Sequence, residues 1–242
     1  MKNNLILLLV FFFLIHVHLS GKTIYSKVEN SNTLVVLIHG LADKPFSMLR
    51  LQNKMIKHRY SVLNFDYKST KWPMDSIVTE LDQNLRSLDE DIDSIYFVVH
   101  SLGTFVVRSY LAEVKNSKVK QIVMIAPPNK GSILAENFGD HKLFLWSLGE
   151  SGQKLGKGQD DFWKSYPSPN IPFGIIAGGT NYREGFNPAI PGDDDGIVGV
   201  NETVIRGYTD IIKVPGLHSM LPWQDNVIDQ TLYFLKYQRF QH

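Results

Sequence analysis

The sequence contains no cysteine. This absence excludes disulfide bonds, thiolate metal sites, a cysteine nucleophile and an amino-terminal lipoprotein anchor. An excess of one charge is also missing, since 25 Lys and Arg residues stand against 24 Asp and Glu residues and no basic run stands out. A nearly neutral chain has little electrostatic attraction for nucleic acid phosphates. We therefore expect no nucleic-acid partner, and the fold has to be stabilised by packing.

The chain has 242 residues, and residues 1–20 have the profile of a signal peptide. Lys2 precedes an apolar run over residues 5–15, and the small residues Ser20 and Gly21 follow it. The run is short for a membrane span, which needs about 20 apolar residues. We expect the leader to be removed on export, which predicts a periplasmic or secreted protein. A retained signal anchor is the alternative.

Residues 21–242 have the length of one domain. Apolar strand-like runs alternate there with segments whose apolar residues recur at helical spacing. This alternation predicts an α/β fold, with a mainly parallel sheet of about six strands and helices on both faces. The expected strands are residues 34–38, 61–65, 95–99, 121–125, 171–177 and 211–214. The expected helices are residues 46–58, 75–88, 102–114 and 222–237.

One stretch, residues 127–170, is too long for an ordinary connection between a strand and a helix. It is rich in Gly, Ser and Pro and carries several aromatic side chains, among them Trp146, Phe162 and Trp163. Long insertions of this kind are usually lids or binding loops. Two roles for the rings remain open: packing the insertion onto the sheet, or lining a lid that covers an acyl-binding site and contacts a membrane surface.

The strongest local motif is Val99-His100-Ser101-Leu102-Gly103, at the junction of an expected strand and an expected helix. It resembles the nucleophile elbow Gly-x-Ser-x-Gly, in which a sharp strand-to-helix turn exposes the serine hydroxyl. Gly103 meets the demand for a small residue, whereas Val99 stands where glycine is common. Ser101 is therefore the candidate nucleophile. His100 is expected to point away from it and to be structural.

A serine hydroxyl is a weak nucleophile, so it needs a base that is itself oriented by an acid. The triplet Asp193-Asp194-Asp195 follows the expected strand 171–177, and His218 follows the expected strand 211–214. All of these positions lie beyond strand carboxyl ends, where ligands bind in open parallel sheets. His218 is the candidate base, and one of the aspartates is the candidate acid. A solvated loop and a calcium site are alternative readings of the triplet.

The segment Leu37-Ile38-His39-Gly40-Leu41 ends the first expected strand. It resembles the His-Gly loop that offers backbone N–H groups to the negative charge of a tetrahedral intermediate. Gly40 lets the chain turn so that the next N–H faces the serine, a role that a side chain would obstruct. The expected oxyanion-hole donors are the N–H groups of Leu41 and Leu102.

Taken together, these segments are similar to the α/β-hydrolase superfamily, and more narrowly to small bacterial serine hydrolases of the lipase and esterase type. The likeness extends over most of the mature chain. The sequence Asp-Gly-Ile-Val that begins at Asp195 resembles the segment carrying the catalytic acid in bacterial lipases, which favours Asp195 over Asp194. The resemblance implies an α/β-hydrolase fold that cleaves a small-molecule or lipid acyl ester through Ser101, His218 and Asp195, with an acyl-enzyme intermediate.

No cofactor or metal is expected for this chemistry. Two alternatives to ester hydrolysis remain. The first is a thioesterase, amidase or acyltransferase that uses the same three residues, because fold and triad define the chemistry better than the acceptor. The second is a non-catalytic envelope binding protein that keeps the scaffold.

Overall fold

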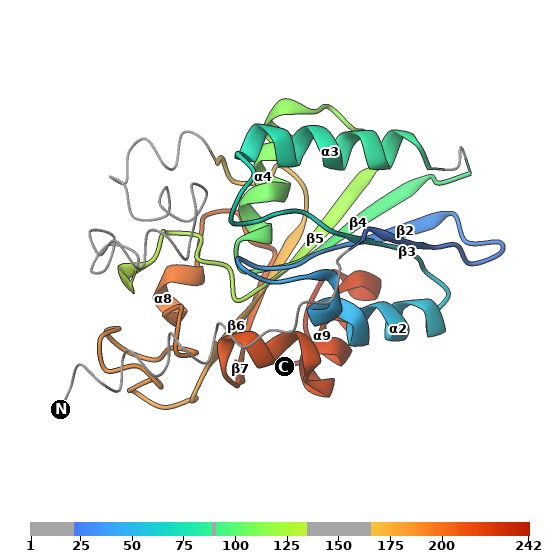
Figure 1. The fold of residues 1–242 in the computed structure, drawn as a ribbon. Coiled ribbons are helices and arrows are strands. Elements are labelled where there is room, and N and C mark those ends of the chain that lie inside the picture. Colours follow the sequence, from blue (N-terminus) through green and yellow to red (C-terminus); the bar gives the residue numbers. More distant parts are fainter. Residues whose placement is uncertain (1–21, 89–90, 135–165) are drawn as a thin grey trace.

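The computed structural model describes residues 22–88, 91–134 and 166–242 (Figure 1). The expected signal peptide, residues 1–20, and most of the expected lid-like insertion, residues 127–170, lie outside these ranges. Within the described ranges, no helix combines the length and the apolar character that crossing a membrane requires.

The centre of the protein is a seven-stranded sheet in the order β1-β3-β2-β4-β5-β6-β7. The strands are β1 (Ile24–Ser26), β2 (Thr33–Ile38), β3 (Ser61–Phe65), β4 (Ser94–His100), β5 (Val119–Ile125), β6 (Phe173–Gly179) and β7 (Asp210–Pro215). Strands β2 to β7 pair in parallel and confirm the expected six. The edge strand β1 was not predicted. It is antiparallel to β3 and has only three residues, too few for an alternating pattern to be recognised.

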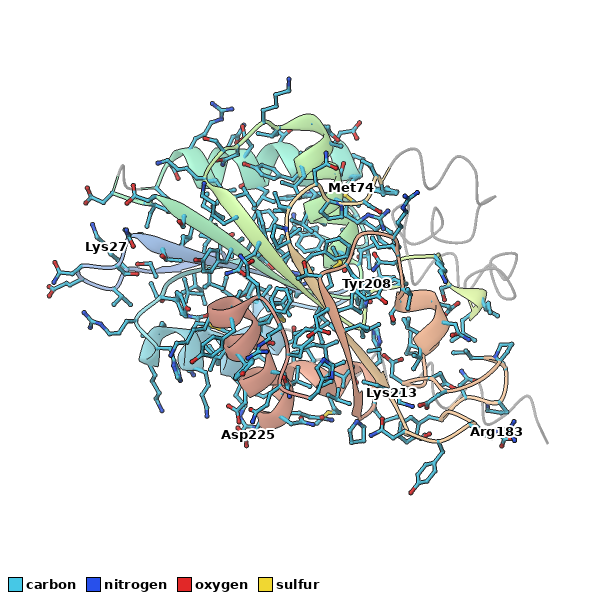
Figure 2. All side chains as sticks on the ribbon, turned by 180° about the vertical axis from the view of Figure 1, so that it is seen from behind. Lys27, Met74, Arg183, Tyr208, Lys213 and Asp225 are labelled. Atoms are coloured by element: carbon cyan, nitrogen blue, oxygen red, sulfur yellow. The ribbon has the colours of Figure 1, made fainter. Side chains whose placement is uncertain are left out.

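Helices cover both faces of the sheet, as expected. Figure 1 shows α3 (Met74–Arg86) and α4 (Gly103–Glu113) on one face, and α2 (Leu49–Lys57) and α9 (Asp225–Tyr237) on the other. The short helix α8 (Val200–Thr203) was not predicted. The 3-10 helix η1 (Pro45–Met48) overlaps the start of the expected helix 46–58, and the 3-10 helix η3 (His218–Trp223) overlaps the start of the expected helix 222–237 at its last two residues. Asp225, labelled in Figure 2, accepts two hydrogen bonds of 2.8 Å from Arg50, which joins α9 to α2.

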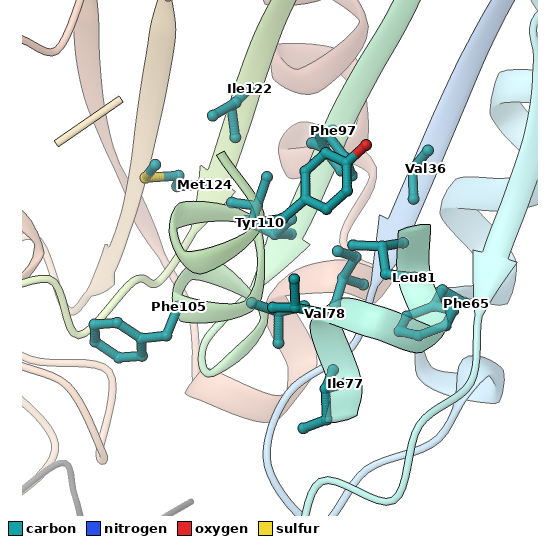
Figure 3. Close-up of a cluster of buried hydrophobic side chains, with 14 of the residues drawn as sticks. Val36, Phe65, Ile77, Val78, Leu81, Phe97, Phe105, Tyr110, Ile122 and Met124 are labelled. Atoms are coloured by element: carbon teal, nitrogen blue, oxygen red, sulfur yellow. The ribbon is translucent and has the colours of Figure 1, made fainter. Parts of the chain in front are cut away.

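The core lies on both sides of the sheet because the central strands are covered on both faces. On β2, Leu34, Val36 and Ile38 belong to the core beneath α3 and α4, part of which Figure 3 shows. Val35 and Leu37 belong to the opposite core beneath α2 and α9. All five side chains are fully buried. This double burial explains why the strand reads as a continuous apolar run rather than an alternating one.

The direction of the chain across the sheet changes at β2, which pairs in parallel with both β3 and β4. The carboxyl ends of β2 and β4 therefore form a topological switch point, the usual place for ligands in open parallel sheets. The register pairs Ile38 with Val99. The segments that follow these residues, which carry Gly40 and Ser101, consequently lie next to each other.

Candidate active site

The turn between β4 and α4 has the strained backbone that the elbow motif predicts. Ser101 has φ of 51°, in the left-handed region that non-glycine residues rarely adopt, and its N–H donates to the Ile125 carbonyl at 3.0 Å. Glycine is required at position 103, because a Cβ there would lie 2.7 Å from the Ile38 carbonyl oxygen. Val99 is completely buried in the core beneath α3 and α4. A larger residue than glycine at this position is therefore compatible with the turn.

The loop after β2 lies directly against this turn. A Cβ on Gly40 would come within 3.2 Å of both the Ser101 Cβ and the His100 Nδ1. Close approach, rather than a left-handed backbone, is thus the reason for glycine at this position. Within the described ranges, the N–H groups of Leu41 and Leu102 donate to no other group of the protein. Both expected oxyanion donors are therefore available.

Tyr67, for which the sequence predicted no role, holds this loop through its hydroxyl and its ring. Its hydroxyl donates to the His39 carbonyl at 2.7 Å, and its ring stacks on the His39 ring with a centroid distance of 4.3 Å. His39 in turn donates from Nδ1 to the Gly40 carbonyl at 2.9 Å. Burial raises the pKa of Tyr67 well above its ordinary value of 10, so the phenol remains a donor. A single aromatic residue after a strand gives no sequence signal of this role.

Asp195 and His218 form a buried pair beyond the ends of β6 and β7. His218 Nδ1 and Asp195 Oδ2 are 2.7 Å apart, and the two side chains are 3% and 1% exposed. Asp195 Oδ1 accepts the N–H groups of Ile197 at 3.0 Å and Val198 at 2.7 Å. The backbone N–H of His218 also donates to the backbone carbonyl of Asp195 at 2.9 Å. A carboxylate held in this way keeps the proton of the neutral imidazole on Nδ1 and leaves Nε2 as an acceptor.

Asp194, the alternative acid in the sequence analysis, turns away from His218. Its fully buried carboxylate accepts hydrogen bonds from the N–H groups of Asn187, at 3.0 and 3.2 Å, and Gly196, at 2.6 Å. Burial raises its pKa. Asp194 therefore holds its own loop together, and of the three adjacent aspartates only Asp195 contacts the candidate base.

Asp193 points in a third direction. Its carboxylate accepts hydrogen bonds from Lys213 Nζ at 2.8 Å and from the N–H and hydroxyl of Thr180 at 2.7 and 2.9 Å; Lys213 is labelled on β7 in Figure 2. The three carboxylates thus have separate sets of donors and do not converge as calcium ligands would. Across residues 22–88, 91–134 and 166–242, no group of three or more His, Asp or Glu side chains is suited to hold a metal ion.

The contacts of Asp193 predict a pH-dependent contribution to stability. Burial acts to raise its pKa, but the hydrogen bonds from Lys213 and Thr180 outweigh burial and lower it. The folded state therefore favours the carboxylate: the stabilisation is complete above the unfolded pKa of about 3.9 and disappears as pH falls through the lower folded value. Urea unfolding should give a lower midpoint for Asp193→Asn than for wild type at neutral pH, with the two midpoints converging in acid.

Exposed Asp229 supplies the control, since the urea midpoint of Asp229→Asn should match that of wild type at every pH. A constant difference for Asp193→Asn at every pH would contradict this account.

Ser101 lies in the same region as the Asp195 and His218 pair, although no hydrogen bond among the described residues joins its hydroxyl to the His218 ring. The link runs through His100, whose ring centroid lies 4.7 Å from that of His218. His100 also has its Nε2 3.1 Å from the His218 carbonyl oxygen. The sequence predicts that His100 is structural, and nothing in its local pattern indicates this contact.

Arg108 on α4 connects the helix behind Ser101 to both described ends of the expected insertion. Its guanidinium donates to the Asn129 Oδ1 at 3.0 Å, to the Pro167 carbonyl at 3.1 Å and to the Tyr166 carbonyl. Burial lowers its pKa to about 10, so the group stays charged at neutral pH. An arginine on an otherwise apolar helix face gives no indication of these partners in the sequence.

Comparisons with known proteins support the fold. No protein-family model matches the chain, and no curated protein matches it in sequence. Among solved structures, the Bacillus licheniformis lipase BlEst2 matches with a TM-score of 0.65 and 17% identity, over 90% of this chain and 97% of the lipase. The bromoperoxidase from Bacillus anthracis matches with a TM-score of 0.63 and 16% identity, over 88% of this chain and 94% of that enzyme.

Phospholipase PlaB from Legionella pneumophila matches with a TM-score of 0.57 and 20% identity, over 71% of this chain. The match spans only 44% of PlaB, less than half of that phospholipase. Sheet topology, helix placement and these likenesses together define an α/β-hydrolase fold, as the sequence predicted. More particularly, the chain shares this fold with lipases, esterases and a bromoperoxidase. Likeness at such low identity defines the architecture and leaves the reaction to be argued from the site.

Proposed function

We propose that the protein is a serine hydrolase that cleaves carboxylic esters, with Ser101 as nucleophile, His218 as general base and Asp195 as the acid that orients it. The observation that carries this proposal is the buried 2.7 Å hydrogen bond between Asp195 and His218. It lies at the same end of the sheet as the strained turn of Ser101. A serine hydroxyl becomes a good nucleophile when a base, oriented by an acid, lies close to the strand-to-helix turn that carries the serine.

The first half of the reaction forms the acyl-enzyme. His218 Nε2 takes the hydroxyl proton as the Ser101 oxygen bonds to the ester carbonyl carbon, and Asp195 stabilises the imidazolium without taking the proton. The N–H groups of Leu41 and Leu102 bind the oxyanion, and each such donor is worth about 10²–10³ in rate. The tetrahedral intermediate collapses as the carbon–oxygen bond to the alcohol breaks, and the alcohol leaves with the proton from His218.

The second half releases the acid. Water gives a proton to His218 and attacks the acyl carbonyl, and the bond to Ser101 breaks as the serine regains its proton. Neither half requires a cofactor. In ligand-free sites of this kind, the hydrogen bond between nucleophile and base is often long and shortens when substrate binds.

The substrate class that we propose is an acyl ester of a small molecule or a lipid. Two apolar side chains flank the turn at Gly196, because a Cβ there would lie 3.6 Å from Leu217 and 3.9 Å from Phe186. Each of these side chains is 45% exposed. Exposed apolar groups beside the Asp195 and His218 pair favour an uncharged, apolar substrate.

The leader over residues 1–20 supports a place in the periplasm or outside the cell. Contact of residues 127–170 with a membrane surface remains part of the same proposal.

A fluorophosphonate probe tests this function, since it reacts with serines activated by a base. We expect one labelled peptide, containing Ser101, from the folded protein and none from heat-denatured protein. A panel of p-nitrophenyl esters, with a matching thioester and anilide, should then show that the esters are hydrolysed fastest. Folded protein that is neither labelled nor active would make it a binding protein. If the thioester or the anilide is turned over faster than the esters, the substrate class is thioesters or amides instead.

A further inference from the structure

We infer that His100 is a positioning residue for His218. Its ring lies between the oxyanion loop, which is the loop after β2 that carries Gly40 and Leu41, and the segment after β7 that carries His218. The inference rests on the proposed function, because it assigns His100 a part in the same reaction. His100 is the last residue of β4 and immediately precedes Ser101. It acts through His218 and is not itself proposed to contact the substrate.

The first contact is with the backbone of His218. His100 Nε2 lies 3.1 Å from the His218 carbonyl oxygen, and the two rings pack at a centroid distance of 4.7 Å and an angle of 41°. A carbonyl only accepts hydrogen bonds, so Nε2 carries the proton and donates it. The bond spans 118 positions of the sequence and joins the end of β4 to the segment after β7.

The second contact is with the oxyanion loop. The opposite edge of the His100 ring faces Gly40, where a Cβ would lie 3.2 Å from Nδ1 and 3.6 Å from Cε1. Nδ1 is buried and has no hydrogen-bond partner among the described residues. One side chain therefore fills the space between the loop after β2 and the segment after β7, while its own backbone leads into the serine turn.

The hydrogen bonds around His218 show what His100 adds. The His218 N–H donates to the Asp195 carbonyl at 2.9 Å, and the His218 Nδ1 is held by the Asp195 carboxylate. His100 holds the other backbone polar group of His218, its carbonyl. With these three groups restrained, the direction in which Nε2 points is determined by the protein before substrate arrives, as the proposed proton transfer from Ser101 requires. Displacing a reacting group by about 1 Å can cost 10²-fold in rate.

The protonation state of His100 agrees with this role. Burial lowers its pKa well below the ordinary value of 6.5, and the neighbouring His218 and His39 lower it further. The bond to the His218 carbonyl acts in the opposite direction and is outweighed. His100 is thus neutral at working pH, and the imidazolium that forms on His218 during the reaction does not meet a second positive charge.

A matched pair of variants separates the hydrogen bond from the packing. His100→Gln places an N–H donor near the position of Nε2, whereas His100→Met has a similar length and no donor. We expect His100→Gln to retain kcat within about 3-fold of wild type. We expect His100→Met to lose about 10-fold to 100-fold in kcat with KM changed less than about 3-fold, because only the placement of the base suffers. Thermal unfolding should show both variants folded.

Equal loss of kcat in both variants, or no loss in His100→Met, would overturn the inference while leaving the proposed function intact. Absence of labelling and turnover in wild type would instead overturn the proposed function. The contact itself is then tested without activity by ¹H–¹⁵N spectroscopy of the histidine side chains in wild-type protein. We expect a neutral His100 with its proton on Nε2 between about pH 6 and 8, given the downward pKa shift. A protonated ring or an Nδ1–H tautomer would contradict the assignment even if His100→Met fails to fold.

Discussion

Ser101→Ala is expected to lower kcat for a p-nitrophenyl ester by about 10⁵-fold or more, because removal of the nucleophile from a serine triad has an effect of this size. The oxyanion donors and the Asp195 and His218 pair remain, so a small residual rate over water should persist. The measurement is initial-rate hydrolysis at saturating ester, together with loss of fluorophosphonate labelling.

The fold of this variant should be unchanged. The Ser101 side chain makes no hydrogen bond among the described residues. Alanine and serine also have a similar backbone strain at φ of 51°, because both carry a Cβ. Thermal unfolding should therefore be close to that of wild type. Ser87 on the protein surface offers a control, since its hydroxyl donates only to the Asn84 carbonyl within its own helix end. Full activity in Ser101→Ala would remove the nucleophile assignment, and a matching loss in Ser87→Ala would point to damage unrelated to the site.

Asp195→Asn is expected to lower kcat by about 10³–10⁴-fold with little change in overall structure. The asparagine oxygen can still accept the N–H groups of Ile197 and Val198, which hold the loop. Its NH₂ group then faces His218 and favours the tautomer with the proton on Nε2, which cannot accept the proton of Ser101. The kcat of the purified variant at several pH values is the measurement.

Asp194→Asn is the matched control, because the two residues are adjacent and both are buried. Its carboxylate accepts hydrogen bonds from Asn187 and Gly196 rather than from His218, and an asparagine oxygen can still accept both, so Asp194→Asn should keep kcat close to that of wild type. The acid assignment would be wrong if Asp194→Asn abolished turnover and Asp195→Asn preserved it.

The main elements of the fold follow from local patterns. The apolar runs of β2 to β7 and the spacing of apolar residues on α2, α3, α4 and α9 reflect burial on one or two faces, which any window of sequence records. Strand β1 could not be predicted, because its three residues are placed by pairing with β3 rather than by a pattern of their own. The roles of Tyr67 and Arg108 could not be predicted for a similar reason, since their hydrogen-bond partners lie in distant segments of the chain.

For the site, the sequence by itself determined that Ser101, the aspartate triplet and His218 follow the ends of parallel strands, which must meet at one edge of the sheet. Only the tertiary structure decided which aspartate contacts His218 and what His100 contacts. Neighbouring residues of a loop can point in any direction, and Gly196, with φ of 95°, turns the chain just after the three carboxylates. Spacing records where a strand ends, but the direction of a side chain beyond that end depends on torsion angles and packing against segments far away in the chain.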